Sequence, residues 1–139
     1  MDSKYDTIID SFMDHTFGVD DHFLPDEMTA GLQQHILELE RSGSFKAAHI
    51  GNAVNPDWKQ KKRNDQVYWL DDAHDNEFER SFLTHIKGFV THLNATCYTG
   101  INAWEFHYAV YDPGSFYKRH KDQFRNNTDR KFSLISYLN

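Results

Sequence analysis

The sequence predicts a single α+β domain in which helices pack on one side of a jelly roll. Two observations predict it. Apolar residues recur at helical spacing in three stretches before residue 95, whereas residues 104–111 and 131–139 alternate apolar and polar side chains with period two. The 139 residues suit one domain, and we find no internal repeat, low-complexity segment or second domain, so we treat 1–139 as one unit.

Composition limits the function classes. The chain is 39% hydrophobic and 15% aromatic, enough for a core, and its net charge of −6 argues against a general binder of nucleic acid or of anionic membranes. Its one cysteine, Cys97, rules out an intramolecular disulfide framework and suits a reducing compartment. We see no signal peptide and no apolar run long enough to span a membrane, and we expect a cytoplasmic protein.

Three helices are expected in the first two thirds of the chain. A short amphipathic helix covers Tyr5 to Met13, a second runs from about Glu27 to Arg41 with Asp26 as candidate N-cap, and a third covers Asn76 to Asn94. His85 and His92 have no cysteine or acidic partner at ligand spacing, so we interpret both as structural. His35 lies on the apolar face of its helix, where a histidine is usually a partly buried packing residue.

Short strands are expected at Phe45 to Ile50 and at Val67 to Leu70. Between them, Asn52 to Asp65 contains Pro56 and the basic run 59–63, which predicts a long polar loop. Two interpretations remain open for this loop: a solvated connection, or a basic lid that closes over a peptide substrate. The acidic stretch 71–75 is predicted to be a solvated turn that leads into a helix.

The chemistry is concentrated in 111–125, YDPGSFYKRHKDQFR. Asp112-Pro-Gly-Ser115 is turn chemistry between a strand at 104–111 and a second strand at 116–122. His120 and Asp122 are two apart, so on a strand their side chains share one face. A neighbouring imidazole and carboxylate form two thirds of the face that holds Fe(II) in non-heme oxygenases. On the pair alone, a structural ion pair explains the spacing equally well.

The surrounding segments resemble a known family. Tyr111-x-Pro-Gly-x-x-Tyr117-x-x-His120-x-Asp122, then Arg130 and the segment SLISYLN at 133–139, is similar to the 2-oxoglutarate/Fe(II)-dependent prolyl hydroxylases. It is nearest to the branch that contains the oxygen-sensing hydroxylases of animals and their bacterial counterparts. The segment RNDQVYWL at 63–70 and the helical stretch after it extend the resemblance over roughly residues 45–139.

The resemblance implies a double-stranded β-helix and specific roles for six residues. Fe(II) would be held by His120 and Asp122, and 2-oxoglutarate would be contacted by Tyr111 and Tyr137. Tyr117 would line the substrate pocket and Arg130 would lie near the substrate peptide. The implied reaction consumes O2 and converts 2-oxoglutarate to succinate and CO2 while a prolyl residue of a protein substrate is hydroxylated, with ascorbate as an optional auxiliary reductant.

One departure from the family pattern leaves alternatives open. The third iron ligand, a distal histidine, and the arginine that pairs with the far carboxylate would follow later than Asn139, so we expect a jelly roll and an iron face that are incomplete at the C-terminal end. Three hypotheses follow: a prolyl hydroxylase, a related oxygenase with a non-prolyl substrate, and a non-catalytic binding module of the same fold. The first two hypotheses describe dioxygenases, whose substrate would be a protein, a peptide or another molecule. The sequence predicts no oligomeric state.

Overall fold

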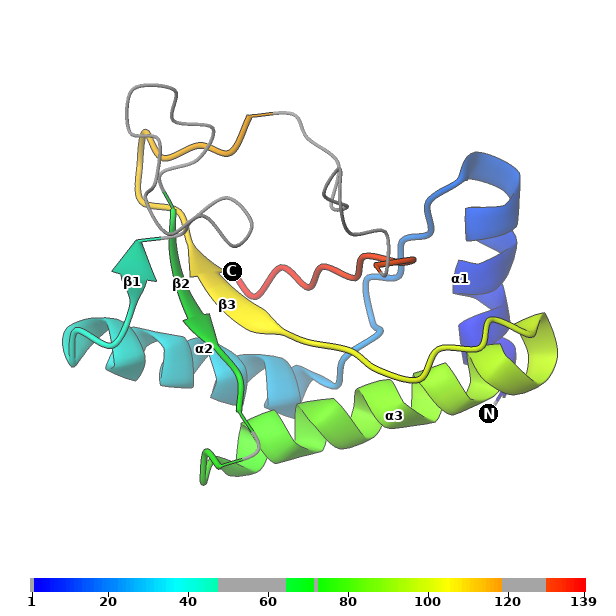
Figure 1. The fold of residues 1–139 in the computed structure, drawn as a ribbon, viewed down its shortest axis with the longest axis horizontal. Coiled ribbons are helices and arrows are strands. Elements are labelled where there is room, and N and C mark those ends of the chain that lie inside the picture. The colour runs from blue at the N-terminus through cyan, green and yellow to red at the C-terminus, as the bar shows by residue number, and fades with distance from the viewer. Residues whose placement is uncertain (1, 48–64, 72, 119–129) are drawn as a thin grey trace. The chain divides into compact units, whose positions relative to one another are not determined.

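The computed structural model describes residues 2–47, 65–71, 73–118 and 130–139. Its elements, in chain order, are α1 (Asp2–His15), α2 (Asp26–Arg41), β1 (Lys46–Ala47), β2 (Gln66–Trp69), α3 (Glu77–Cys97) and β3 (His107–Val110) (Figure 1). The chain divides into two compact units, and α2 contributes its first half to one and its second half to the other. Unit 1 comprises residues 1–34 and 71–105, and unit 2 comprises residues 35–70 and 106–139.

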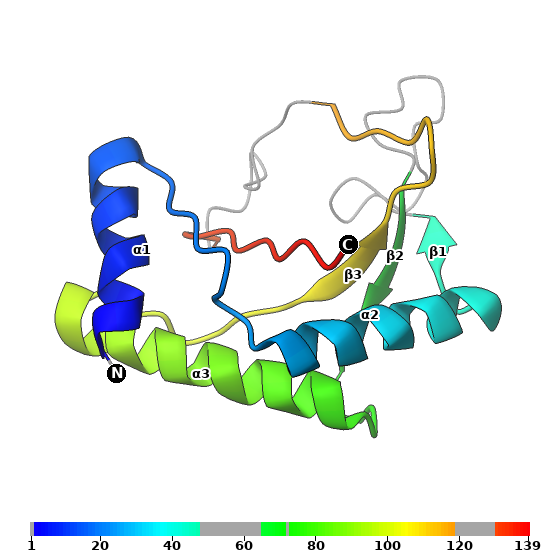
Figure 2. The ribbon, with the colours of Figure 1, turned by 180° about the vertical axis from the view of Figure 1, so that it is seen from behind.

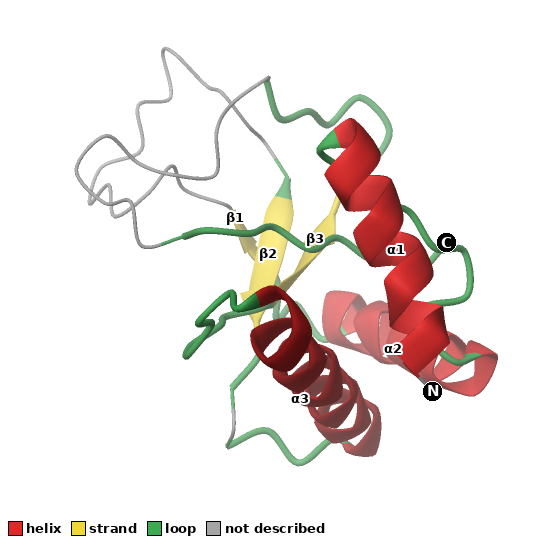
Figure 3. Ribbon diagram, turned by 90° about the vertical axis from the view of Figure 1, so that its right-hand side faces the viewer, coloured by secondary structure: helices red, strands yellow, loops and turns green. Residues whose placement is uncertain are grey.

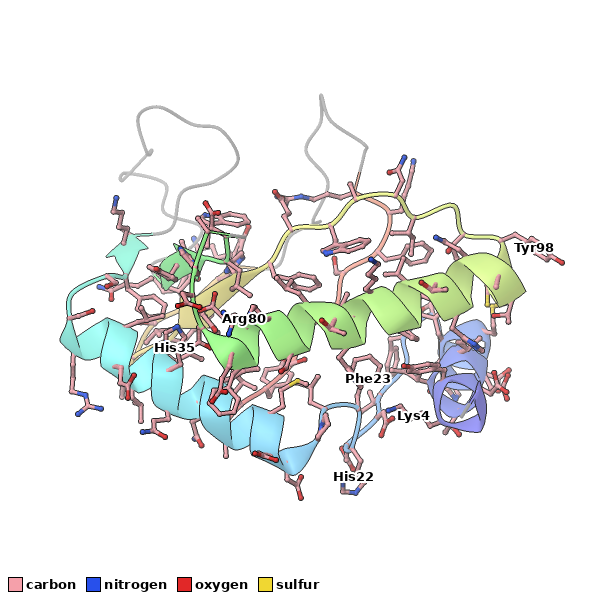
Figure 4. The ribbon with its side chains drawn as sticks, turned by 90° about the horizontal axis from the view of Figure 1, so that it is seen from below. Lys4, His22, Phe23, His35, Arg80 and Tyr98 are labelled. Carbon is pink, nitrogen blue, oxygen red and sulfur yellow. The ribbon has the colours of Figure 1, made fainter. Side chains whose placement is uncertain are left out.

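The longest element of unit 1 is α3, and local signals set both of its ends. Asn76 is the N-cap: its side-chain oxygen accepts hydrogen bonds from the N–H groups of Phe78 (2.9 Å) and Glu79 (3.0 Å). At the other end Tyr98 adopts the left-handed conformation, with φ 53°, which ends the helix. Tyr98 projects into solvent beyond this end of α3 (Figure 4). The predicted third helix is therefore confirmed.

Asn94 fixes the chain where it leaves α3. Its side-chain oxygen accepts from the N–H of Ile101 (2.8 Å) and the hydroxyl of Thr99 (2.6 Å), while its amide donates to the Ile101 carbonyl (2.8 Å). One side chain thus uses both its acceptor and its donor to close the loop that follows the helix.

The helix α1 lies against the second half of α3, as two opposite views show (Figures 1 and 2), and aromatic side chains pack between the two helices. Tyr5 on α1 lies 5.1 Å, ring to ring, from both Phe89 and His92 on α3. Phe23, from the loop after α1, packs edge-on to Phe89 and His85 at 5.0 Å (Figure 4). The remaining core of this unit is aliphatic and aromatic: Leu32, Phe82, Ile86 and Val90 are all buried.

Unit 2 contains a three-stranded antiparallel sheet in the order β1-β2-β3 (Figure 3). The register between β2 and β3 pairs Tyr68 with Tyr108 and Trp69 with His107. Successive side chains on a strand point to opposite faces, so Tyr68 and Tyr108 share one face while Trp69 and His107 share the other. Tyr108 is buried, and both Trp69 and His107 are exposed.

The buried face of the sheet packs against aromatic side chains of the same unit. Phe45 lies 6.0 Å from Tyr68, and His35, in the second half of α2, meets Tyr108 edge-on at 6.0 Å. The expected packing role of His35 is confirmed by this contact. The sheet therefore buries one face and leaves the other to solvent among the described residues.

Several sequence-based expectations need correction. Asp26 is not an N-cap: the N–H of Thr29 donates to the Pro25 carbonyl, so Asp26 already lies in the first turn of α2. The strand expected over 104–111 is limited to β3, because Trp104 lies outside the ladder and is 43% exposed. Of the expected strand 45–50, only the two residues of β1 are described as a strand, and residues 48–50 lie outside the described ranges.

The C-terminal expectations fare differently. The segment Lys131–Asn139 was expected to be a strand, yet none of its described residues belongs to one. The expected strand 116–122 shows a single bridge residue, Tyr117, in its described part. The proposed lid, 52–65, lies outside the described residues except for its last residue, Asp65, which is buried. No helix of the described chain is long and apolar enough to cross a membrane.

Two glycines give a matched test of the helix packing in unit 1. Gly31 on α2 faces the Phe78 ring so closely that a Cβ would overlap it, whereas a Cβ on Gly88 of α3 would meet only the Tyr5 hydroxyl, at 3.7 Å. We expect Gly31→Ala to lower the free energy of unfolding by about 1–3 kcal/mol through overpacking. Gly88→Ala should raise it by about 0.5–1 kcal/mol, because alanine restricts the unfolded chain. Urea denaturation measures both, and equal effects would contradict this packing.

Candidate functional site

A tight turn follows β3 in the chain and precedes the segment that carries His120. The N–H of Ser115 donates to the Asp112 carbonyl at 2.8 Å, and Gly114 has φ 88°. Pro113 at the second position and a glycine with positive φ at the third are typical of a type II turn. The turn predicted from the sequence is confirmed, and it fixes the direction of the chain just after Tyr111.

Tyr111 continues the alternation of β3 on its exposed face. His107 and Ala109 precede it by four and two residues, so the three side chains follow the same side of the strand. Register places Trp69 opposite His107 on this face, and Val67 opposite Ala109. Tyr111 is 48% exposed and Trp69 47% exposed. This face therefore carries large side chains that are open to solvent.

Trp69 and His107 form a pair on the exposed face that the sequence alone did not single out. Their rings are 4.8 Å apart in an edge-on arrangement. His107 Nδ1 lies 3.0 Å from the Tyr108 carbonyl oxygen. A carbonyl only accepts, so Nδ1 carries a proton, and in the neutral ring Nε2 is left as an acceptor. Period-two alternation placed both residues on strands, but only the inter-strand register brings them together.

The other site residues of the sequence analysis are placed as follows. Tyr117 is half-buried, and Arg130 is exposed. Tyr137 is 83% exposed, and Ile135, two residues before it, is 71% exposed. These three belong to unit 2, as do Tyr111 and the Trp69–His107 pair. His120 and Asp122 lie outside the described residues.

The described donors suit an anionic co-substrate. Tyr111 and Tyr137 both present phenol groups at the surface of unit 2, and a phenol O–H is a good donor to a carboxylate. No three histidine, cysteine, aspartate or glutamate side chains gather in a metal-binding group among the described residues. The proposed iron ligands lie outside the described residues, so the fit concerns the organic co-substrate.

The histidines of α3 have structural roles within unit 1. His85 Nε2 donates to the Phe23 carbonyl at 2.7 Å. Burial lowers the pKa of His85, the hydrogen bond to Phe23 opposes this, and the charge of Lys4 lowers the pKa further. His92 Nε2 lies 3.4 Å from an Asp6 carboxylate oxygen. Both contacts connect α3 to the N-terminal segment. They agree with the interpretation of His85 and His92 as structural residues.

Two acidic side chains are buried where the sequence suggested only solvated positions. Glu79 on α3 is 2% exposed, and its carboxylate lies 3.2 Å from His74 Nδ1, in the turn before the helix. Asp65, immediately before β2, is 1% exposed. Acids are rarely buried unless they are paired, and His74 is such a partner for Glu79. Residue type alone gives no signal that distinguishes them from surface acids.

One solved structure provides a comparison. No model of a known protein family matches the chain, and no curated protein matches its sequence. The fold is similar to the crystal structure of a prolyl-4-hydroxylase from Pseudomonas putida, with a TM-score of 0.75 and 25% sequence identity. The match covers 86% of this chain and 61% of that hydroxylase. The chain therefore has a fold like that of a prolyl-4-hydroxylase, and it spans about three fifths of that protein's length.

The lowered pKa of His85 predicts how stability depends on pH. The unfolded chain, with the ordinary histidine pKa of about 6.5, binds a proton more readily than the folded chain does. Neutral His85 therefore makes its full contribution to the free energy of unfolding above pH about 6.5. This contribution is lost as the pH falls toward the lower pKa of the folded state. His85→Gln, which keeps a donor for Phe23, should weaken the loss of stability on acidification.

Urea denaturation at pH about 7.5 and about 5.5 checks this difference. His22→Gln is the control, because His22 is an exposed histidine in the same unit. An unchanged pH dependence in His85→Gln would contradict the burial argument.

Proposed function

We propose that this chain is the Fe(II)- and 2-oxoglutarate-binding part of an oxygenase that hydroxylates a prolyl residue of a protein or peptide. The observation that carries the proposal is the structural similarity to the Pseudomonas putida prolyl-4-hydroxylase over 86% of this chain. The motif Tyr111-x-Pro-Gly-x-x-Tyr117-x-x-His120-x-Asp122 supports it independently.

His120 and Asp122 would supply two iron ligands. A neutral imidazole and a carboxylate are the donors that Fe(II) takes in facial sites, whereas thiolates would favour zinc. Bound there, the metal would supply the chemistry that splits O2, placing one oxygen atom in succinate as 2-oxoglutarate loses CO2 and the other in the hydroxylated product. The protein's part is to hold both organic partners in place and to keep water out.

Tyr111 and Tyr137 would bind the co-substrate through their phenol groups. Each can donate one hydrogen bond to a charged carboxylate oxygen, and such bonds are stronger than bonds between neutral groups. Tyr111 and Tyr137 are 48% and 83% exposed, so a ligand can approach both residues. Tyr111 directly follows β3, so it would orient the co-substrate without a large rearrangement of the sheet.

Substrate recognition is assigned to Tyr117 and Arg130. The phenol of Tyr117 is half-buried beside the turn, where it would line the pocket, and Arg130 is exposed and would meet the peptide. An exposed guanidinium offers several donors to peptide carbonyls and carboxylates. A peptide substrate would explain why Arg130 is exposed.

Loss of either proposed iron ligand should abolish catalysis in the natural protein. We expect His120→Ala and Asp122→Ala to eliminate substrate-dependent conversion of 2-oxoglutarate to succinate while the circular dichroism spectrum is retained. His22→Ala, at an exposed histidine in the other unit, should leave turnover unchanged. Wild-type turnover in Asp122→Ala would contradict the assignment, and no turnover in the natural protein would favour the non-catalytic binding module.

Tyr137→Phe should weaken 2-oxoglutarate binding without removing the metal. The change deletes one hydrogen bond to a charged oxygen, worth about 1.5–3 kcal/mol, which is roughly a tenfold or greater loss of affinity. Tyr98→Phe is the matched control, because Tyr98 is 88% exposed in unit 1. Calorimetric titration with 2-oxoglutarate measures both variants, and equal affinities would refute the proposed role of Tyr137.

A further inference from the structure

The exposed face of the sheet in unit 2 continues beyond the Trp69–His107 pair. Lys46 on β1 lies directly opposite Val67 on β2, and Val67 in turn lies opposite Ala109 on β3. Directly opposite residues of antiparallel strands share a face, and alternation along β2 places Val67 on the same face as Trp69. This face therefore carries two neighbouring cross-strand rows, which are Trp69 with His107 and Lys46 with Val67 and Ala109.

Both rows are open to solvent. Val67 is half-buried, and the other four residues are exposed. In the described part of the chain, no carboxylate lies within ion-pair distance of the Lys46 ammonium group. Asp65, two residues before Val67, is 1% exposed, so its carboxylate is closed off from a ligand. The charge that this face offers to a ligand is therefore positive.

The side chains around Trp69 are held in fixed positions. The Trp69 ring meets His107 edge-on at 4.8 Å, and His107 is oriented by the hydrogen bond from its Nδ1 to the Tyr108 carbonyl at 3.0 Å. Side chains whose orientation is already fixed lose little conformational entropy when a ligand binds. Lys46 is the diagonal neighbour of Trp69, at a separation of about 7–8 Å, which long side chains can span. The face thus presents a fixed aromatic ring with a lysine beside it.

These side chains fit an extended peptide that carries a carboxylate. Aromatic rings on a protein surface bind proline and other apolar residues of extended peptides. In such a peptide, side chains two residues apart point to the same side and are separated by about 7 Å. This separation matches the diagonal from Trp69 to Lys46. A peptide whose apolar residue covers Trp69 would place the side chain two positions away over Lys46, where a carboxylate is favoured.

We propose that this face of the sheet binds the peptide substrate and selects an acidic residue two positions from a prolyl or other apolar residue. The inference rests on the proposed function, because the peptide is the substrate of the proposed hydroxylation. The face is continuous with the proposed co-substrate site, since Tyr111 extends the same side of the strand two residues beyond Ala109. Nucleic acid bases also stack on aromatic rings, but the net charge of −6 disfavours such a partner.

Two labelled peptides of equal composition test this selection. Both contain one proline and two glutamates among alanine and glycine. In the first peptide the glutamates lie two positions from the proline on either side, and in the second they lie directly beside it. The natural protein, without metal or co-substrate, should bind the first peptide about threefold more tightly in fluorescence anisotropy, because one exposed ion pair contributes modestly.

Nuclear magnetic resonance locates the bound peptide. The indole N–H signal of Trp69 in isotope-labelled protein is assigned by its loss in Trp69→Phe. This signal should shift when the first peptide is added, because the apolar residue of the peptide would cover the ring.

Variants of Lys46 test the source of the glutamate preference. Lys46→Met removes the charge and keeps the length of the side chain, so it should make the two peptides bind equally, and Lys46→Arg should restore the preference. The control is Lys87→Met, which removes an exposed lysine of unit 1 and should retain the wild-type preference. Lys46→Met should leave the affinity for 2-oxoglutarate unchanged.

Several outcomes would overturn the inference. They are equal binding of the two peptides by the wild type, an unchanged preference in Lys46→Met, an unshifted Trp69 signal and a lower 2-oxoglutarate affinity in Lys46→Met. Tighter binding of an oligothymidylate of about 10 nucleotides than of either peptide would overturn it as well. Turnover of 2-oxoglutarate without the glutamate preference rejects this inference alone. The preference without turnover rejects the proposed hydroxylation and leaves a peptide-binding face.

Discussion

The pairing of β2 with β3 is the constraint on which the functional argument depends. Tyr68 opposes Tyr108 and Trp69 opposes His107, so one register decides which side chains face the core. A slip of one residue would expose Tyr108 and bury His107, exchanging the two faces of the sheet. Tyr108 packs against His35 on the buried side, a contact that this register allows. Side chains alternate between the two faces along β3, and Tyr111 continues this alternation on the exposed face.

Helices were predicted well because their signals are local. The apolar spacing and Asn76, directly before the acidic first turn, were enough to place α3 to within a few residues. Strands were predicted less well because a strand needs a partner. Lys131–Asn139 alternates in sequence, and its burial still alternates, with Ile135 and Tyr137 exposed and Leu134 and Leu138 half-buried. Alternation alone does not make it a strand among the described residues.

The candidate site was predictable where its chemistry is contiguous in sequence. The turn at Asp112–Ser115 follows from proline and glycine positions, and the exposed side of Tyr111 follows from period two. The Trp69–His107 pair required the register between segments almost forty residues apart in sequence, which no local pattern contains. Burial of Glu79 beside His74 likewise depends on how the turn folds back on α3.

The central claim, that His120 and Asp122 hold a metal ion, is tested most directly by a paramagnetic probe. Mn(II) takes the same oxygen and nitrogen donors as Fe(II) and broadens amide signals near its site. Adding Mn(II) to isotope-labelled protein should broaden the signals of residues 117–123 first, and Asp122→Ala should remove this selectivity. Uniform broadening, or broadening that is unchanged in Asp122→Ala, would contradict the account.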